Sequence, residues 1–274
     1  MPSADHGLAV KESGTHGAPT LVFLHGGGVG GWMWQPITAF LDEFHCLAPD
    51  MPEQGESLHI APFSIQSAAD QIAALIEARA TNGKAHLIGL SLGGQVVVDL
   101  LARHTDKIER AIVSSALARP VPGASMYTEG FIRASYRWFV QPFKKMGWFT
   151  RLNMRSNAAI PNEYYEHFKR DYERGTAESF AHIFSENLKF RPSEALKQVH
   201  VPTLLVVGAK EASLMRQSAK DLAALLPNSK AVQHSFGVTR AEAHNWSFQA
   251  PQVFAEMVRA WVTDSPLPSA LKPL

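Results

Sequence analysis

The sequence predicts an α/β fold: a mostly parallel central sheet flanked by helices, with an inserted helical cap. Short apolar runs that end in turn residues alternate with longer helical patterns, which is typical of parallel strands joined by crossover helices. This alternation stops between residues 119 and 198, where aromatic residues and helical spacing replace the apolar runs. The chain has 274 residues, of which 46% are hydrophobic, so it is long and apolar enough for one large domain with an insertion.

Six apolar runs are the predicted strands. In chain order they are TLVFLHGGG (20–28), FHCLAPDMP (44–52), AHLIGLS (85–91), IERAIVSSA (108–116), VPTLLVVGAKE (201–211) and KAVQHS (230–235). Three further stretches carry apolar residues at helical spacing, and these are SIQSAADQIAALIEARA (64–80), QSAKDLAALLP (217–227) and QVFAEMVRAWV (252–262). The pattern therefore predicts helices on both faces of one sheet.

The same pattern predicts the domain boundaries. Residues 1–118 and 199–263 form the predicted core, and residues 119–198 form the predicted helical cap. The last segment, 264–274, has proline at 266, 268 and 273. Because proline disrupts regular structure, we expect this segment to be a loose tail.

Composition excludes several classes of protein. A net charge of +1 gives the whole molecule no strong attraction to nucleic acid or to an anionic surface. The single cysteine, Cys46, rules out an intramolecular disulfide and a cysteine-based metal site. The N-terminal stretch MPSADHGLAVKESG lacks a basic head with an apolar core, and no segment approaches the roughly 18 apolar residues of a membrane helix. We therefore expect a cytoplasmic protein without stable membrane association.

Within the predicted cap, residues 131–162 contain basic and aromatic side chains but no Asp or Glu. The basic residues are Arg133, Arg137, Lys144, Lys145, Arg151 and Arg155, and the aromatic ones include Tyr136 and Phe143. Such a mixture fits nucleic acid, an anionic membrane surface or a lid that receives an anionic substrate. The pattern favours a simpler arrangement, in which apolar side chains pack inward beneath a solvated basic face, and no nucleic acid partner is expected.

The stretch GLSLGG places Ser91 between Gly89 and Gly93, after an apolar run and before a helical pattern. Glycines at these positions permit a sharp turn from strand to helix, which lifts the serine hydroxyl above the edge of the sheet. The backbone N–H of Leu92 then lies at the start of the helix, where it can stabilise an oxyanion. The alternative is a serine that only caps a glycine-rich helix start.

A second glycine-rich stretch, HGGGVGGWMW, follows the first predicted strand. Bare backbone here can approach a substrate closely, and Gly27 is the candidate for a second oxyanion donor. A phosphate-binding loop is the competing interpretation, but the stretch lacks the Gly-Lys-Ser/Thr that ends such a loop.

A serine nucleophile needs a base, and His244 is the favoured histidine because it lies in a polar segment between the last predicted strand and the last helix. Glu211, at the end of a strand, is the favoured carboxylate to orient it. Glu242 and Asp221 remain open as alternatives, although both are more simply solvated. His25 and His86 adjoin strands and are interpreted as structural, and His234 is a candidate for the end of the last strand.

These features together resemble the α/β-hydrolase fold superfamily, over nearly the whole chain. The motifs that carry the resemblance are HGGGVGGWMW, APDMPEQGES, GLSLGG, VVGAKE and AHNW, in that order. The resemblance implies that Ser91 is the nucleophile, His244 the base and Glu211 the acid, and that Leu92 and Gly27 donate backbone N–H groups to the oxyanion.

Three departures from that family are visible. Glu211 stands where Asp is commoner, Leu90 replaces a polar residue often found before the nucleophile, and Glu53-Gln54 replaces Gly-His in a structural turn.

Among members of the superfamily, the chain is similar to compact, lid-bearing esterases and carbon-carbon bond hydrolases. The resemblance implies hydrolysis of a small to medium carboxylic ester through an acyl-enzyme, without metal or organic cofactor. An apolar substrate pocket is expected from the aromatic side chains of the cap and of the glycine-rich loop. These are Trp32, Trp34, Trp138, Phe139, Trp148 and Phe149.

Other functions remain open at this point. Cleavage of a carbon-carbon bond, or opening of a lactone, uses the same three residues. A non-catalytic receptor for a small ligand, and an adaptor that binds membrane or nucleic acid through the cap, are alternatives of another class. The sequence does not decide between a monomer and a homodimer.

Overall fold

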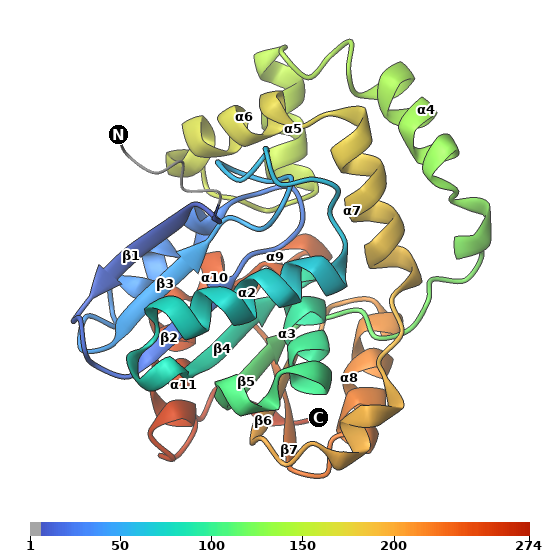
Figure 1. The fold of residues 1–274 in the computed structure, drawn as a ribbon. Helices are drawn as coiled ribbons and strands as arrows, with labels where there is room; N and C mark the ends of the chain where they lie inside the picture. The colour runs from blue at the N-terminus through green and yellow to red at the C-terminus, as the bar shows by residue number, and fades with distance from the viewer. Residues whose placement is uncertain (1–6) are drawn as a thin grey trace.

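Across residues 7–274, which the computed structural model describes, eight strands form one sheet (Figure 1). In chain order they are β1 (Val10–Gly14), β2 (Thr20–Leu24), β3 (His45–Pro49), β4 (Ala85–Leu90), β5 (Ile108–Ser114), β6 (Thr203–Gly208), β7 (Ser229–His234) and β8 (Lys272–Pro273). They pair in the order β1-β3-β2-β4-β5-β6-β7-β8, and only the outermost pairs, β1 with β3 and β7 with β8, are antiparallel. The predicted fold class, a mostly parallel sheet flanked by helices, is confirmed.

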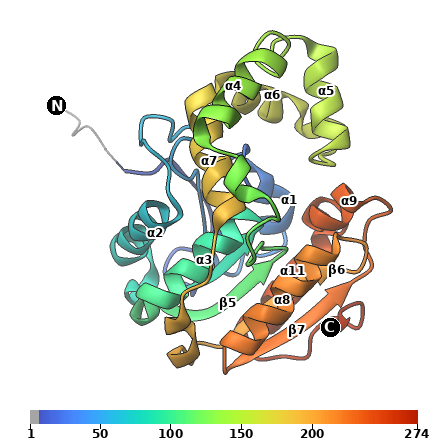
Figure 2. The same ribbon diagram turned by 90° about the vertical axis from the view of Figure 1, so that its right-hand side faces the viewer.

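Helices cover both faces of the sheet (Figures 1 and 2). One face packs against α2 (Ile65–Arg79), α3 (Leu92–Arg103) and α8 (Ser213–Leu225), and the other against α1 (Gln35–Thr38), α10 (Trp246–Gln249) and α11 (Pro251–Val262). The sheet has one hydrophobic core on each face, the first beneath α2, α3 and α8 and the second beneath α1, α10 and α11. In strand β2, Val22 and Leu24 point into the first core, whereas Leu21 and Phe23 point into the second. All five β2 residues are buried, as in strands of a parallel sheet.

The helical interval consists of α4 (Glu129–Phe139), α5 (Gly147–Ser156), α6 (Tyr165–Arg174) and α7 (Ala177–Lys189), which lie together beyond one end of the sheet (Figure 2). The prediction that 119–198 is a separate cap stays a prediction. No helix within residues 7–274 has the length and apolar character needed to cross a bilayer.

Polar contacts fasten α7 to the core. His182 donates from Nδ1 to Glu53 Oε2 at 2.9 Å, and Glu186 Oε2 accepts from the backbone N–H of Ile65, at the start of α2, at 2.9 Å. Asn187 Nδ2 donates to Gln95 Oε1 of α3 at 3.0 Å. These hydrogen bonds therefore fix the position of α7 against both α2 and α3.

Helix α6 contacts the loops beside β2 and β3. The buried carboxylate of Asp171 accepts from Trp32 Nε1 at 2.6 Å, and Arg174 pairs with Glu56 at 2.8 Å. The half of the interval formed by α6 and α7 is thus held directly by the core.

Two strands were not predicted, and one prediction about the chain end is wrong. Strand β1 (VKESG) is half-exposed at the sheet edge, so it has no apolar run to reveal it. The expected loose tail contains β8, and Leu271 is only 7% exposed within the second core. Proline is tolerated there because β8 is an edge strand, where a missing donor costs little. Residues 1–6 of the predicted core segment lie outside the described residues.

The C-terminal packing can be tested with Leu271→Ala. Removing most of this buried side chain should destabilise the protein by about 2 kcal/mol, measured as the free energy of unfolding in urea. Lys272→Ala, at an exposed neighbour in β8, should change it by less than about 0.5 kcal/mol. Equal stability of Leu271→Ala and wild type would restore the loose-tail interpretation.

Candidate active site

Ser91 lies in the turn between β4 and α3, in a backbone conformation that residues other than glycine rarely adopt. Its φ is 56° and its ψ is −116°. Backbone hydrogen bonds hold this conformation, because Ser91 N donates to Ser114 O at 2.9 Å and Gln95 N donates to Ser91 O at 3.2 Å. The strained residue is thereby fixed between the end of β5 and the first turn of α3.

The two glycines around Ser91 are required by close backbone contacts. A Cβ at Gly89 would lie 2.4 Å from the carbonyl oxygen of Gly93, and a Cβ at Gly93 would lie 2.1 Å from that of Leu24. Both distances are far shorter than van der Waals contact. The G-x-S-x-G spacing is therefore a packing requirement of this turn.

The serine does not serve as a helix cap. Ser91 occupies the position before α3, but its side chain makes no capping hydrogen bond. The hydrogen bond that would define Ser91 as a helix cap is therefore missing. The hydroxyl is left for other chemistry.

The glycine-rich loop after β2 passes beside this turn. A Cβ at Gly26 would lie 3.8 Å from Ser91 Cβ, and one at Gly27 would lie 3.7 Å from Leu92 Cδ2 and 3.4 Å from Ile183 Cγ2 of α7. The structure thus brings the two predicted oxyanion donors, Gly27 and Leu92, next to each other and to Ser91.

Side chains from other segments hold the loop in place. His25 donates from Nδ1 to Gly26 O at 2.7 Å and accepts at Nε2 from Met51 N at 2.9 Å. Burial lowers the pKa of His25, so its ring is neutral and the two nitrogens have opposite roles. Gln54, one of the departures from the family pattern, accepts from Gly28 N at 2.8 Å.

Glu211 and His244 come together from separate elements. Glu211 follows β6, and His244 is the last residue of α9 (Arg240–His244). The two are joined by a hydrogen bond of 2.9 Å between His244 Nδ1 and Glu211 Oε2. The other carboxylate oxygen, Oε1, accepts from Gly208 N and from Ser115 Oγ, each at 2.7 Å.

These contacts decide the charge of Glu211, whose side chain is only 2% exposed. Burial acts to raise the pKa of its carboxyl. The hydrogen bond and charge of His244, with the donors of Gly208 and Ser115, outweigh burial and hold the pKa below its ordinary value. The carboxylate is therefore ionised at neutral pH and can fix the His244 ring with Nδ1 protonated.

The alternative acids are engaged elsewhere. Glu242 accepts from the backbone N–H groups of Val238 and Thr239 at 2.7 and 2.8 Å, forming a capping box for α9. Asp221 of α8 pairs with Arg119. Neither is hydrogen-bonded to His244 in the described residues.

Two other histidines named from the sequence are neutral. Burial lowers the pKa of His86 and of His234 to about 4 in each case. His234 ends β7 as expected and stacks on Trp246, with ring centroids 4.4 Å apart.

Two serines at the end of β5, which were not predicted to belong to the site, support it. Ser115 supports the carboxylate of Glu211, and Ser114 Oγ accepts from Trp246 Nε1 at 3.0 Å, which anchors the segment after His244. Ser115 also has a positive φ of 53°, so its backbone turns at the sheet edge. The signal was present as two adjacent serines at the end of the apolar run IERAIVSSA.

The structure does not bring the six predicted pocket aromatics together. Trp32 and Trp34 are fully buried, and Trp34 packs against Phe23 and Phe254 in the core. Trp138, Phe139 and Trp148 are 77%, 73% and 61% exposed, whereas Phe149 is partly buried beside Trp148. The expectation that the apolar side chains of the cap pack inward is wrong for these three.

One group of side chains has the spacing of metal ligands. Donor atoms of Glu12, His16 and His45 lie within 4.8 Å of one another, at the beginning of β3 and so at the opposite end of this strand from the glycine-rich loop. The Glu12 carboxylate is already engaged by His45 Nε2 at 2.5 Å and by Arg79. The adjacent guanidinium disfavours a cation there, and the group is explained as an ion-pair network that ties β1 to β3 and α2.

Comparison with known proteins shows what the chain resembles in sequence and in fold. The model of a family described as the alpha/beta hydrolase family matches residues 21–257. A pimeloyl-[acyl-carrier protein] methyl ester esterase from Neisseria meningitidis is 27% identical over 87% of this chain and 91% of its own length. An AB hydrolase superfamily protein from Gibberella zeae is 27% identical over 95% and 86%. A thermophilic esterase from Thermogutta terrifontis superposes with a TM-score of 0.71 at 23% identity, covering 94% and 93%, a similarity of fold alone.

The charge of Glu211 predicts a pH-dependent contribution to stability. Because its folded-state pKa lies below the ordinary 4.5, the carboxylate stabilises the fold above that pH, and this is lost as pH falls through the folded-state pKa. Glu211→Gln should therefore lower the free energy of unfolding by about 3 kcal/mol at pH 7 and by less at pH 3.5. Urea unfolding at both values measures this, with the exposed Glu163→Gln as control. An equal difference at both would exclude the charge as its cause.

Proposed function

The chain belongs to the alpha/beta hydrolase family, and from this premise we propose that it is a serine hydrolase that cleaves small to medium carboxylic esters through an acyl-enzyme. It is an enzyme of the carboxylesterase-like class. The substrate and the roles of the individual residues are the proposed part.

The backbone conformation of Ser91 is the main support for this function. Ser91 is held at φ 56° and ψ −116° with a side chain that caps nothing. A strained residue persists only where the surrounding structure enforces it, and such strain is concentrated at functional sites. We assign Ser91 as the nucleophile, because it lies beside the glycine-rich loop and its side chain makes no capping hydrogen bond.

His244 is the proposed base. With Nδ1–H donated to the ionised Glu211, the free nitrogen Nε2 is the proton acceptor. As Ser91 Oγ bonds to the ester carbonyl carbon, its proton passes to Nε2, and Glu211 stabilises the resulting imidazolium. The oxyanion accepts hydrogen bonds from the N–H groups of Leu92 and Gly27.

The remaining steps return the enzyme to its starting state. The carbon–oxygen bond to the alcohol breaks, and the alcohol leaves with the proton from Nε2. Water then gives a proton to Nε2 and bonds to the acyl carbon. The second tetrahedral species releases the carboxylic acid, and Ser91 Oγ regains its proton.

The relatives support an ester as substrate, since the Neisseria protein is named for hydrolysis of a methyl ester. Apolar side chains border the proposed oxyanion donors: Leu92 of α3 and Ile183 of α7 both lie within van der Waals distance of the point that a Cβ on Gly27 would occupy. This surrounding fits the apolar part of a small ester. Lactone opening and carbon-carbon bond cleavage would use the same residues, and a substrate panel separates them.

Ser91→Ala tests the nucleophile. Hydrolysis of short and medium p-nitrophenyl esters should fall on the order of 10⁶-fold, because the covalent step loses its attacking atom. Wild type should be labelled by a fluorophosphonate, and the variant should not. A folded wild type that neither hydrolyses esters nor takes the label would refute an activated serine.

Glu211→Gln tests the acid. An uncharged amide cannot hold the imidazolium, so kcat should drop by about 10⁴-fold with a smaller change in KM. Glu242→Gln is the matched control, since glutamine can keep the capping box of α9 and should leave kcat near that of wild type. If the two variants gave the reverse pattern, the role of the acid would pass to Glu242.

A further inference from the structure

Helices α4 and α5 expose an unusual number of large apolar side chains. Of the twelve that are exposed in the described chain, nine lie between Met126 and Leu152, with Trp138 at 77%, Phe139 at 73% and Trp148 at 61% exposure. Soluble proteins rarely expose contiguous apolar surface of this kind unless it binds something. We call the exposed side chains of residues 126–155 the aromatic face.

The aromatic face points away from the core because of how α4 is seated. Its inner side carries the buried Ile132 and Tyr136, and Tyr136 packs on Phe180 of α7 with ring centroids 5.1 Å apart. Phe131 and Trp138, seven residues apart and so on one side of the helix, are exposed. Figure 1 shows α7 between α4 and the core. Helix α4 thus has apolar side chains on two sides, and only one of them is covered.

The segment that carries the aromatic face is also strongly basic. Residues 126–155 contain six Lys and Arg and one Glu, a net charge of +5, whereas the whole chain has +1, so the remainder is net −4. Glu178 of α7 pairs with Arg133 and Arg137, and the other four cations of the segment accompany its exposed aromatic side chains.

Most of these charges lack an acidic partner. Lys144, Lys145, Arg151 and Arg155 form no ion pair with any described residue. Instead Lys144 donates to Gly175 O, Arg151 lies over the ring of Tyr165, and Arg155 donates to the side chain of Asn162. No carboxylate within residues 7–274 therefore lies at ion-pair distance from these four side chains.

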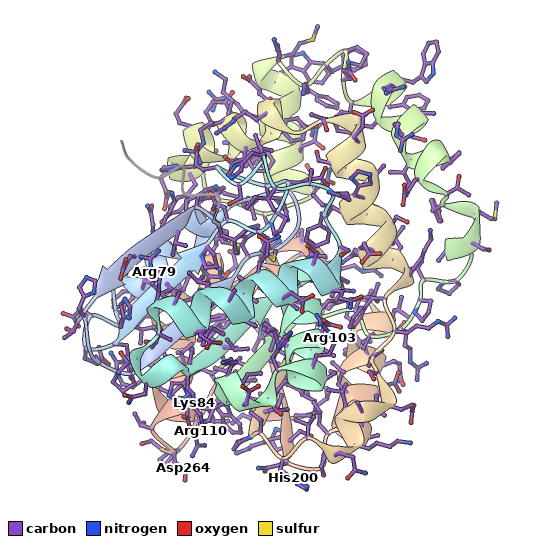
Figure 3. The ribbon with its side chains drawn as sticks, in the orientation of Figure 1. Arg79, Lys84, Arg103, Arg110, His200 and Asp264 are labelled. Carbon is purple, nitrogen blue, oxygen red and sulfur yellow. The ribbon has the colours of Figure 1, made fainter. Side chains whose placement is uncertain are left out.

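Pairing elsewhere in the described chain is mixed. Figure 3 labels four basic residues outside the helical interval that each pair with a carboxylate: Arg79 with Glu12, Lys84 with Glu109, Arg103 with Asp70 and Arg110 with Asp264. Others, such as Lys11, Lys220 and Lys230, form no ion pair with any described residue. What sets the aromatic face apart is therefore the combination of unpaired cations with exposed aromatic rings.

From this combination we infer that the aromatic face docks on an anionic phospholipid bilayer. Trp and Phe partition into the headgroup region, and unpaired Lys and Arg are attracted to anionic lipid. Aliphatic side chains on the same face, such as Met146 and Leu152, suit acyl chains but not the stacking of nucleic acid bases. A second copy that met the first through the same face would bring like charge against like charge. The docking is peripheral and salt-sensitive, and it does not depend on turnover.

The test is flotation of the full chain with vesicles of phosphatidylcholine alone or with 30% phosphatidylglycerol. At low salt we expect at least ten-fold stronger partitioning to the anionic vesicles, and a large loss at 0.5 M NaCl. Trp138→Ala/Trp148→Ala and Lys145→Glu/Arg151→Glu should each weaken it at least ten-fold. Both of these double variants should hydrolyse a soluble ester like wild type, which shows that they are folded.

Matched controls lie outside the aromatic face. Phe40→Ala removes another exposed ring, and Lys84→Glu/Lys230→Glu makes the same change in charge at other exposed positions. Both should bind vesicles like wild type, and so should Ser91→Ala, which separates docking from the proposed esterase mechanism.

Three results would overturn the inference. The first is no preference for anionic vesicles. The second is undiminished binding by both variants of the aromatic face. The third is a dimer, or binding of RNA, that depends on Trp138 and Trp148 in the absence of any vesicle binding.

Discussion

The buried carboxylate of Glu211 is the interaction on which the geometry of the site depends. It receives hydrogen bonds from Gly208 at the end of β6, from Ser115 after β5 and from His244 in α9. Taking a charge out of water is costly, and three donors offset that cost only while all of them stay in position. The ends of two neighbouring strands and the segment that carries His244 are therefore fixed relative to one another by one side chain.

Much of the fold, and the turn that carries Ser91, could be predicted from the sequence because they depend on local requirements. Parallel strands are buried on both faces and show as apolar runs, and the turn at Ser91 requires glycine at 89 and 93 by close backbone contact. Elements that face solvent, such as β1 and β8, have no such signal. The prediction of the pocket residues was wrong because the sequence pattern identifies apolar side chains without showing what covers them. Trp34 lies in the core, and Trp138 lies at the surface.

The substitution of Glu53-Gln54 for the pair usual in the family has a structural counterpart. Gln54 holds the loop that contains Gly27, and Glu53 receives a hydrogen bond from His182. A turn that was expected to be only structural thus connects the glycine-rich loop to α7. The position of α7 therefore depends in part on which residues occupy this turn.

Helix α7 contacts both surfaces of interest, α4 through Phe180 and the glycine-rich loop through Ile183. It is also fixed to α2 and α3 at its far end, through Glu186 and Asn187. Because α7 is one continuous helix, its contacts with α4 and with the backbone around Gly27 belong to a single rigid element. A rigid-body shift of α7 would therefore change both contacts together.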